Sequence, residues 1–144
     1  MTAMTRPPLT LEALQAFFRS APFMADLGVE PIEVGEGRVR TSLVLAPRHH
    51  QHTGVVHAGV IGAMADHTMG AAAQTMALEG HWVLTAEFKT SLLRAGRGQR
   101  LECVAVVIKP GRQVSFTEAE VFAIDGDQRT LVAKASATMA VVKA

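Results

Sequence analysis

The stretch AGVIGAMADHTMGAAAQTMAL, residues 58–78, decides the fold of this chain. It has no proline, is rich in alanine and methionine, and carries small or apolar residues on nearly every side. Gly59, Gly62 and Gly70 each cost a helix about 1 kcal/mol relative to alanine, so the segment is helical only if the protein packs around it. We predict a buried helix over 58–78, which Gly80 ends. The glycines within this helix allow other backbones to approach it closely.

A short helix and a hairpin precede this segment. Apolar residues recur at helical spacing within 9–20, Thr10 is a suitable N-cap, and Pro22 is expected to end the helix. Within 32–45 apolar and polar residues alternate around Gly35-Glu36-Gly37, which predicts a β-hairpin.

Four strands are predicted after the central helix. The turn-forming segments AGRG, KPGR and DGD separate them. In the first strand the alternation predicts that Leu84, Ala86 and Phe88 share one face, with Thr85 on the other. The predicted strands cover residues 82–94, 100–108, 114–123 and 130–142.

This order of elements predicts one α+β domain over 1–144, in which a six-stranded antiparallel sheet wraps the central helix. Residues 1–24 form an N-terminal extension that contains the short helix. The strands carry more apolar surface than one helix can cover, so we expect a homo-oligomer.

The composition excludes several classes of protein. Of 144 residues, 49% are hydrophobic and 19% charged, which excludes intrinsic disorder, and a net charge of +1 argues against a nucleic-acid binder. The single cysteine, Cys103, is interpreted as a core thiol. No segment approaches the roughly 18 apolar residues of a membrane span or resembles a signal peptide. We expect a cytoplasmic, soluble protein with no nucleic-acid or membrane partner.

Basic residues gather between Lys89 and Arg112, where six basic side chains accompany one carboxylate. Arg94, Arg97, Lys109 and Arg112 lie at turns, and Gly111 opens the backbone beside Arg112. This zone suits a small anionic ligand, although solvated strand ends would explain it equally well.

Asp66 is the most informative residue, because every neighbour within a turn is apolar, small or neutral. No lysine or arginine lies three or four residues away to pair with it. A carboxylate in such surroundings is expensive to keep, which predicts a base or nucleophile.

The start of the same helix supplies a second kind of reactive group, the free backbone amides of its first turn. The amides of Ala58 and Gly59 point out of the helix N-terminus and are suited to hold negative charge developing on an oxygen. The sequence thus places an oxyanion donor and a base on one element.

Two other groups are interpreted structurally. His49, His50, His52 and His57 form a solvated loop without a closed metal-ligand set, so no metal or other cofactor is expected. His67 is interpreted as a polar contact at a subunit interface. The methionines are mostly core residues, although Met64 and Met69 are candidates to line an acyl pocket.

The motif Gln51-x-x-Gly54-x-x-His57-Ala58-Gly59, followed by Ala65-Asp66 and Gly70-x-Ala72, resembles hotdog-fold acyl-CoA thioesterases of the PaaI-like, phenylacetate-pathway group. Segments 84–98, 107–123 and 131–139 are similar to the same family in the same order. The resemblance covers residues 25–142, and Ala58 departs from it where the family usually has glycine. It implies a hotdog fold, in which a six-stranded sheet surrounds a long helix, and thioester hydrolysis at the interface of two subunits.

The resemblance also implies residue roles. Asp66 acts as general base or nucleophile, and the amide of Ala58 or Gly59, assisted by His57, polarises the carbonyl. Gln51 contacts the carbonyl or the water, and Thr85 positions the water from the other subunit. Arg94, Arg97, Lys109, Gly111 and Arg112 are candidates to bind coenzyme A.

Three functions are consistent with these residues. The first is an acyl-CoA thioesterase that works as a homodimer, assembled further into a homotetramer. The second is a non-catalytic acyl-CoA-binding protein, which would have no need of Asp66. The third is a hotdog hydratase or dehydratase, whose catalytic pair is expected in a different local context.

Overall fold

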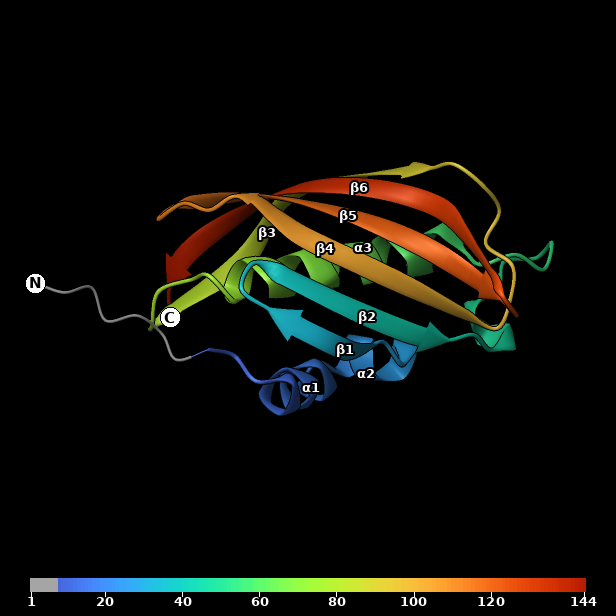
Figure 1. Ribbon diagram of the computed structural model, residues 1–144, viewed down its shortest axis with the longest axis horizontal. Coiled ribbons are helices and arrows are strands. Elements are labelled where there is room, and N and C mark those ends of the chain that lie inside the picture. The colour runs from blue at the N-terminus through green and yellow to red at the C-terminus, as the bar shows by residue number, and fades with distance from the viewer. Residues whose placement is uncertain (1–7) are drawn as a thin grey trace, which may run out of the picture.

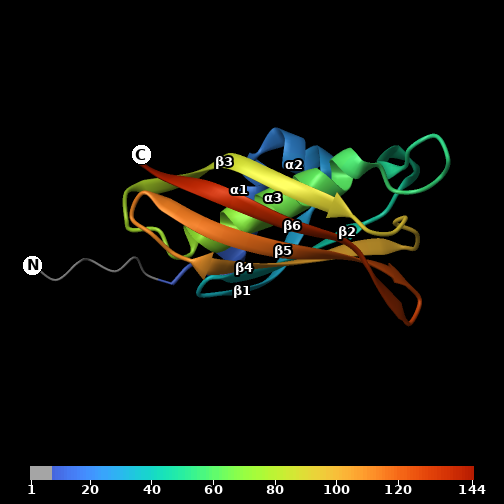
Figure 2. The ribbon, with the colours of Figure 1, turned by 90° about the horizontal axis from the view of Figure 1, so that it is seen from above.

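The structure is a computed structural model that describes residues 8–144, so residues 1–7 of the predicted extension lie outside it. Six strands form one antiparallel sheet in the order β1-β2-β4-β5-β6-β3. The sheet curls around the long helix α3, as Figures 1 and 2 show, and the predicted fold class is confirmed. The elements are α1 (Leu11–Ser20), α2 (Pro22–Leu27), β1 (Glu30–Gly35), β2 (Arg38–Val44), a 3-10 turn (Pro47–His49), α3 (Ala58–Gln74), β3 (His81–Leu92), β4 (Arg100–Lys109), β5 (Val114–Asp125) and β6 (Gln128–Lys143).

The core lies between α3 and the concave face of the sheet. Helix α3 packs against β2, β3, β4, β5 and β6, and most of its residues are buried. The Thr41 and Thr68 hydroxyls share a buried hydrogen bond of 2.8 Å. Cys103 is fully buried, as expected, and this burial raises the pKa of its thiol to about 12.

Helix α3 ends four residues earlier than predicted, at Gln74 rather than Leu78. The Thr75 hydroxyl donates to the Ala72 carbonyl and accepts the Gly37 amide, which ties the helix end to the β1–β2 turn. Gly80, with φ of 76°, belongs instead to the turn that leads into β3.

Pro22 begins a helix rather than ending one, which corrects the prediction. Helix α1 stops at Ser20, Ala21 is extended, and Pro22 occupies the first position of α2. Proline is suited to that position because its missing N–H would have no partner there.

Helix α1 covers the side of α3 that the sheet leaves open, and it touches both edges of the sheet (Figures 1 and 2). Gln15 and Arg19 bond to Pro31 and Glu30 of β1, one edge strand. Phe17 stacks on Trp82 of β3, the other edge strand, with ring centroids 5.9 Å apart. The helix therefore closes the curl of the sheet.

A β-bulge corrects the predicted alternation of β3. Thr85 pairs with Met139 and Glu87 with Thr138, so Ala86 is an extra residue that switches the faces. Thr85 contacts Asp66 of α3, and Phe88 approaches Gly62 of the same helix, so both point inward. Leu84 consequently lies on the opposite face from Phe88.

The anchoring of α1 can be measured. Phe18 is 1% exposed, so we expect Phe18→Ala to lower the free energy of unfolding by about 3–5 kcal/mol. Phe23 is 64% exposed, and Phe23→Ala should change it by about 0.5 kcal/mol or less. Denaturant titration of both variants checks this, and equal losses would contradict the docking of α1 through Phe18.

Candidate functional site

A cavity of about 590 Å³ lies at the N-terminal end of α3. The loop before the helix forms one side of it, and the segment after β3 forms the other. The Val56 amide donates to the Gly96 carbonyl at 3.0 Å and joins the two sides. Gln51, His57 and Ala58 line this cavity together.

His57 caps α3 with its own side chain. Its Nδ1 accepts the Gly59 amide at 2.8 Å, so the Gly59 N–H is occupied. A Cβ at Gly59 would lie 3.0 Å from the same nitrogen, which explains the glycine. Since Nδ1 is an acceptor, a neutral His57 ring carries its proton on Nε2. Within residues 8–144 no acceptor lies on the Ala58 N–H, which leaves this amide free to donate a hydrogen bond.

Gln51 is held by the loop that follows it. Its Oε1 accepts the Thr53 amide, and its backbone carbonyl accepts the Gly54 amide at 2.9 Å. Gly54 has a φ of 83°, a conformation that favours glycine. The amide nitrogen of Gln51, a double donor, remains available to the cavity.

His49 departs from the solvated loop that was predicted, because it is 1% exposed. Its Nδ1 accepts the Ala46 amide at 2.9 Å, and its Nε2 donates to the Leu27 carbonyl at 2.7 Å. With both nitrogens bonded, His49 fixes the loop and is unsuited to ligate a metal. In the described part of the chain no three His, Cys, Asp or Glu side chains gather as a metal site.

Asp66 lies in a second, smaller cavity of about 120 Å³, part-way along α3. The Thr85 hydroxyl donates to its Oδ1 at 2.6 Å, from the same chain rather than from another subunit. The Asp66 side chain is half-buried, so its surroundings are less enclosed than the sequence suggested. The pair leaves Oδ2 and a lone pair of the Thr85 oxygen free for a water.

Gln74 is a positioning residue that sequence reasoning missed. Its Oε1 accepts the Val83 amide and its Nε2 donates to the His81 carbonyl, each at 3.0 Å. These bonds tie β3 to α3 two residues before Thr85, which sets the approach of that hydroxyl to Asp66. The available signal was a lone amide side chain in an alanine-rich helix.

The two sets of residues do not meet within one chain. Asp66 follows Ala58 by eight residues, which places it about 12 Å along the helix. Each set lines its own cavity. A thioester carbonyl held at Ala58 is therefore out of reach of Asp66 in the same chain.

The predicted basic zone is divided between the two ends of the molecule (Figure 1). Arg94 lines the larger cavity and donates to the Leu131 carbonyl, and Arg97 is exposed nearby. Lys109 and Arg112 lie at the other end of the ten-residue strand β4, about 30 Å away. The fold itself requires a glycine at position 111, because a Cβ there would lie 2.1 Å from the Val114 carbonyl oxygen.

Met64 and Met69 do not match their predicted place in an acyl pocket. Both are fully buried in the core, and neither lines a cavity that we describe.

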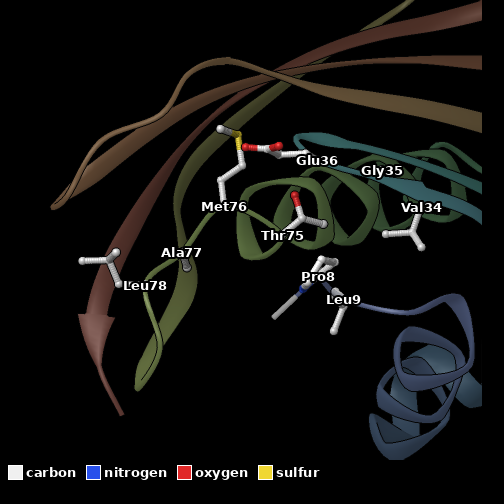
Figure 3. A pocket seen from close by; sticks show the side chains of 9 residues that line it. All are labelled: Pro8, Leu9, Val34, Gly35, Glu36, Thr75, Met76, Ala77 and Leu78. Carbon is white, nitrogen blue, oxygen red and sulfur yellow. The ribbon is translucent and has the colours of Figure 1, made fainter. Parts of the chain in front are cut away.

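A third cavity, of about 460 Å³, lies at the C-terminal end of α3 between Leu9, Val34 and Met76 (Figure 3). Among the residues from 8 to 144, Glu36 is the one ionisable residue that lines it. It contains none of the candidate catalytic residues.

The described residues thus form a hotdog fold with a polar helix N-terminus and a carboxylate–hydroxyl pair. Residues 53–130 match the model of the Thioesterase superfamily, and the chain belongs to this family.

Solved structures agree with this assignment. A thioesterase family protein from Silicibacter pomeroyi is 30% identical, with a TM-score of 0.88 over 91% of this chain and 96% of that one. A conserved protein from Pseudomonas aeruginosa is 31% identical, with a TM-score of 0.77 over 85% and 94%. The PaaI protein of the phenylacetic acid degradation operon of E. coli shares the fold at 18% identity, with a TM-score of 0.80 over 91% of each chain.

Within residues 8–144, no helix has the length and hydrophobicity needed to cross a bilayer.

His67, beside Asp66, packs its ring edge-on against Phe18 of α1, with ring centroids 4.4 Å apart. Burial lowers the pKa of His67 below its usual value, and the Asp66 charge opposes this effect. The unfolded chain therefore binds this proton more readily, and stability falls as the pH drops through about 6.5.

We expect His67→Leu to lose less thermal stability than the parent protein between pH 7.5 and pH 5.5. Thermal melts of both proteins across this range check the expectation. If the melting temperatures of the two proteins fell equally with pH, groups other than His67 would be responsible for the loss of stability in acid.

Proposed function

We propose that the protein is an acyl-CoA thioesterase that hydrolyses an acyl- or aryl-CoA to the free acid and coenzyme A. The observation that carries the proposal is the pairing of the Asp66 carboxylate with the Thr85 hydroxyl, together with an unoccupied amide at Ala58. A base with a bound hydroxyl and a free oxyanion donor are the two parts that water attack on a thioester requires.

The functional unit in this proposal is a homodimer. Strand β3 is a sheet edge that exposes Trp82, Leu84 and Leu92, and an exposed apolar edge is a template for pairing. Antiparallel pairing of two β3 edges would align two α3 helices in opposite directions. Asp66 would then face Ala58 of the partner subunit, which overcomes the separation within one chain.

We further propose that dimers join into a homotetramer through the convex face of the sheet. Val106, Ile108 and Phe116 lie there on neighbouring strands and are each more than a third exposed. Burial of such a patch stabilises an assembly.

The proposed reaction begins with the thioester carbonyl between the Ala58 amide and the Gln51 side chain. The Thr85 oxygen and Asp66 Oδ2 hold a water, and Asp66 takes its proton as the water oxygen bonds to the carbonyl carbon. The tetrahedral oxyanion is stabilised by the helix amide. It collapses by breaking the carbon–sulfur bond, and the proton passes to the departing thiolate.

Two further points complete the proposal. Direct attack by Asp66, through a transient anhydride, would use the same residues, with water hydrolysing the anhydride. The reaction needs no metal or organic cofactor.

We assign the protein to the cytoplasm, where reducing conditions suit a chain with one free cysteine.

We expect Asp66→Asn to lower kcat by two or more orders of magnitude, because amides cannot accept the water proton. The variant should keep the secondary structure and mass of the parent protein. Thiol release from a panel of acyl-CoAs measures the effect. Full turnover by Asp66→Asn would refute the mechanism, and absence of thiol release by the parent protein would refute the activity.

A mixed dimer tests whether the site spans two chains. A heterodimer of Asp66→Asn and Gln51→Ala subunits, isolated with two different tags, contains one intact and one doubly defective site. We expect about half of the parent kcat per dimer, although each homodimer is nearly inactive. A heterodimer as inactive as its parents would place the whole site in one chain.

The nucleotide end of coenzyme A is proposed to contact Arg97, with Arg94, Lys109, Gly111 and Arg112 as further candidates. A phosphate contact far from the carbonyl binds ground state and transition state alike, so it affects KM rather than kcat.

We expect Arg97→Ala to raise KM for an acyl-CoA several-fold and to leave KM for the matching pantetheine thioester unchanged. Arg112→Ala, at the other end of β4, is the matched comparison. A rise confined to Arg112→Ala would move the nucleotide to the β4–β5 turn.

A further inference from the structure

Gly70 is the one glycine of α3 whose missing Cβ faces open space. A Cβ at Gly59 would lie 3.0 Å from the His57 ring, and a Cβ at the buried Gly62 would make an ordinary contact of 3.7 Å with the Phe88 ring. A Cβ at Gly70 would meet nothing within 4 Å. Alanine there would cost no contact and would favour the helix, so the glycine has another reason.

The empty space at Gly70 belongs to the Asp66 cavity. Gly70 follows Asp66 by four residues, so both line the same face of α3 and the same cavity of about 120 Å³. Ala71 and Val83 add apolar surface. Opposite them, Phe17 of α1 forms an aromatic wall, held in place by its stack on Trp82.

We propose that the acyl or aryl group of the substrate occupies the space left by the missing side chain of Gly70, against the ring of Phe17. The inference rests on the proposed thioesterase function and names the residues that set its specificity. An apolar cavity of about 150 Å³ is known to hold a benzene ring. This one is smaller, at about 120 Å³, and has polar residues at its Asp66 side, but its Phe17 wall is 39% exposed and so open to solvent, and a group as large as a single ring can enter part-way. We call this space the acyl chamber. The absent side chain of Gly70 sets its depth, and the Phe17 ring of α1 forms one wall.

A side chain at Gly70 should therefore select by substrate size. In Gly70→Ala and Gly70→Val, we expect kcat/KM for benzoyl-CoA to fall by about 10-fold or more, since a single methylene in a pocket changes discrimination by roughly 10- to 200-fold. The value for acetyl-CoA should stay within about twofold, because that group does not reach the chamber. The melting temperature of Gly70→Ala should equal or exceed that of the parent protein.

Gly62→Ala is the matched control, because it adds the same methyl to the same helix on the face toward Phe88. Its ratio of benzoyl-CoA to acetyl-CoA turnover should match the parent ratio. Phe17→Ala is the converse variant, and it should raise the relative kcat/KM for the two-ring 2-naphthoyl-CoA.

Several outcomes would overturn the proposal. An unchanged ratio in Gly70→Val, or an equal fall for both thioesters, would show that Gly70 does not select the acyl group. A shift of Gly70→Ala to monomers in light scattering would assign the glycine to subunit packing. If the parent protein released no thiol, the proposed function would fail. Calorimetric binding of intact benzoyl-CoA to the parent protein but not to Gly70→Val would then still support the chamber, and equal binding would refute it.

Discussion

The need to bury α3 on nearly all sides governs the rest of this structure. A helix with so little polar surface cannot lie on a flat sheet, because a flat sheet covers only one of its faces. The sheet therefore curls until β2, β3, β4, β5 and β6 all contact the helix. The remaining strip carries Asp66 and Gly70, and α1 covers only part of it. Asp66 and Gly70 thus lie where the covering of the helix is incomplete.

The geometry of α3 also separates Ala58 from Asp66, the two groups that the proposed reaction needs. One ring nitrogen of His57 accepts the Gly59 amide and caps the helix. Among the described residues, the Ala58 amide has no such acceptor and stays free. Asp66 is two turns further on and is oriented by Thr85 from the neighbouring strand. A rigid helix cannot bring these groups together, so a second copy of the chain is the economical way to complete a site.

The sequence was most informative where periodicity or a motif was strong. The fold class and the central helix could be predicted, and the motif singled out Gln51, His57 and Ala58, which line one cavity. The bulge at Ala86 could not, because alternation alone does not reveal an extra residue opposite Met139. The burial of His49 and the role of Gln74 depend on backbone groups distant in sequence. The full burial of Met64 and Met69 could not be foreseen either, because helical spacing does not show which methionines the sheet covers.

The bridging position of α1 has a consequence for how the chain reaches its final form. Phe17 meets Trp82, which is 65 residues later in the sequence, and Phe18 packs on His67. Helix α1 precedes β3 in the sequence, so the Trp82 part of its binding surface does not exist until β3 has been synthesised. Contacts of such long range form slowly, because the intervening chain must be ordered first. The Phe17 ring of α1 therefore stays without its stacking partner until β3 has been made.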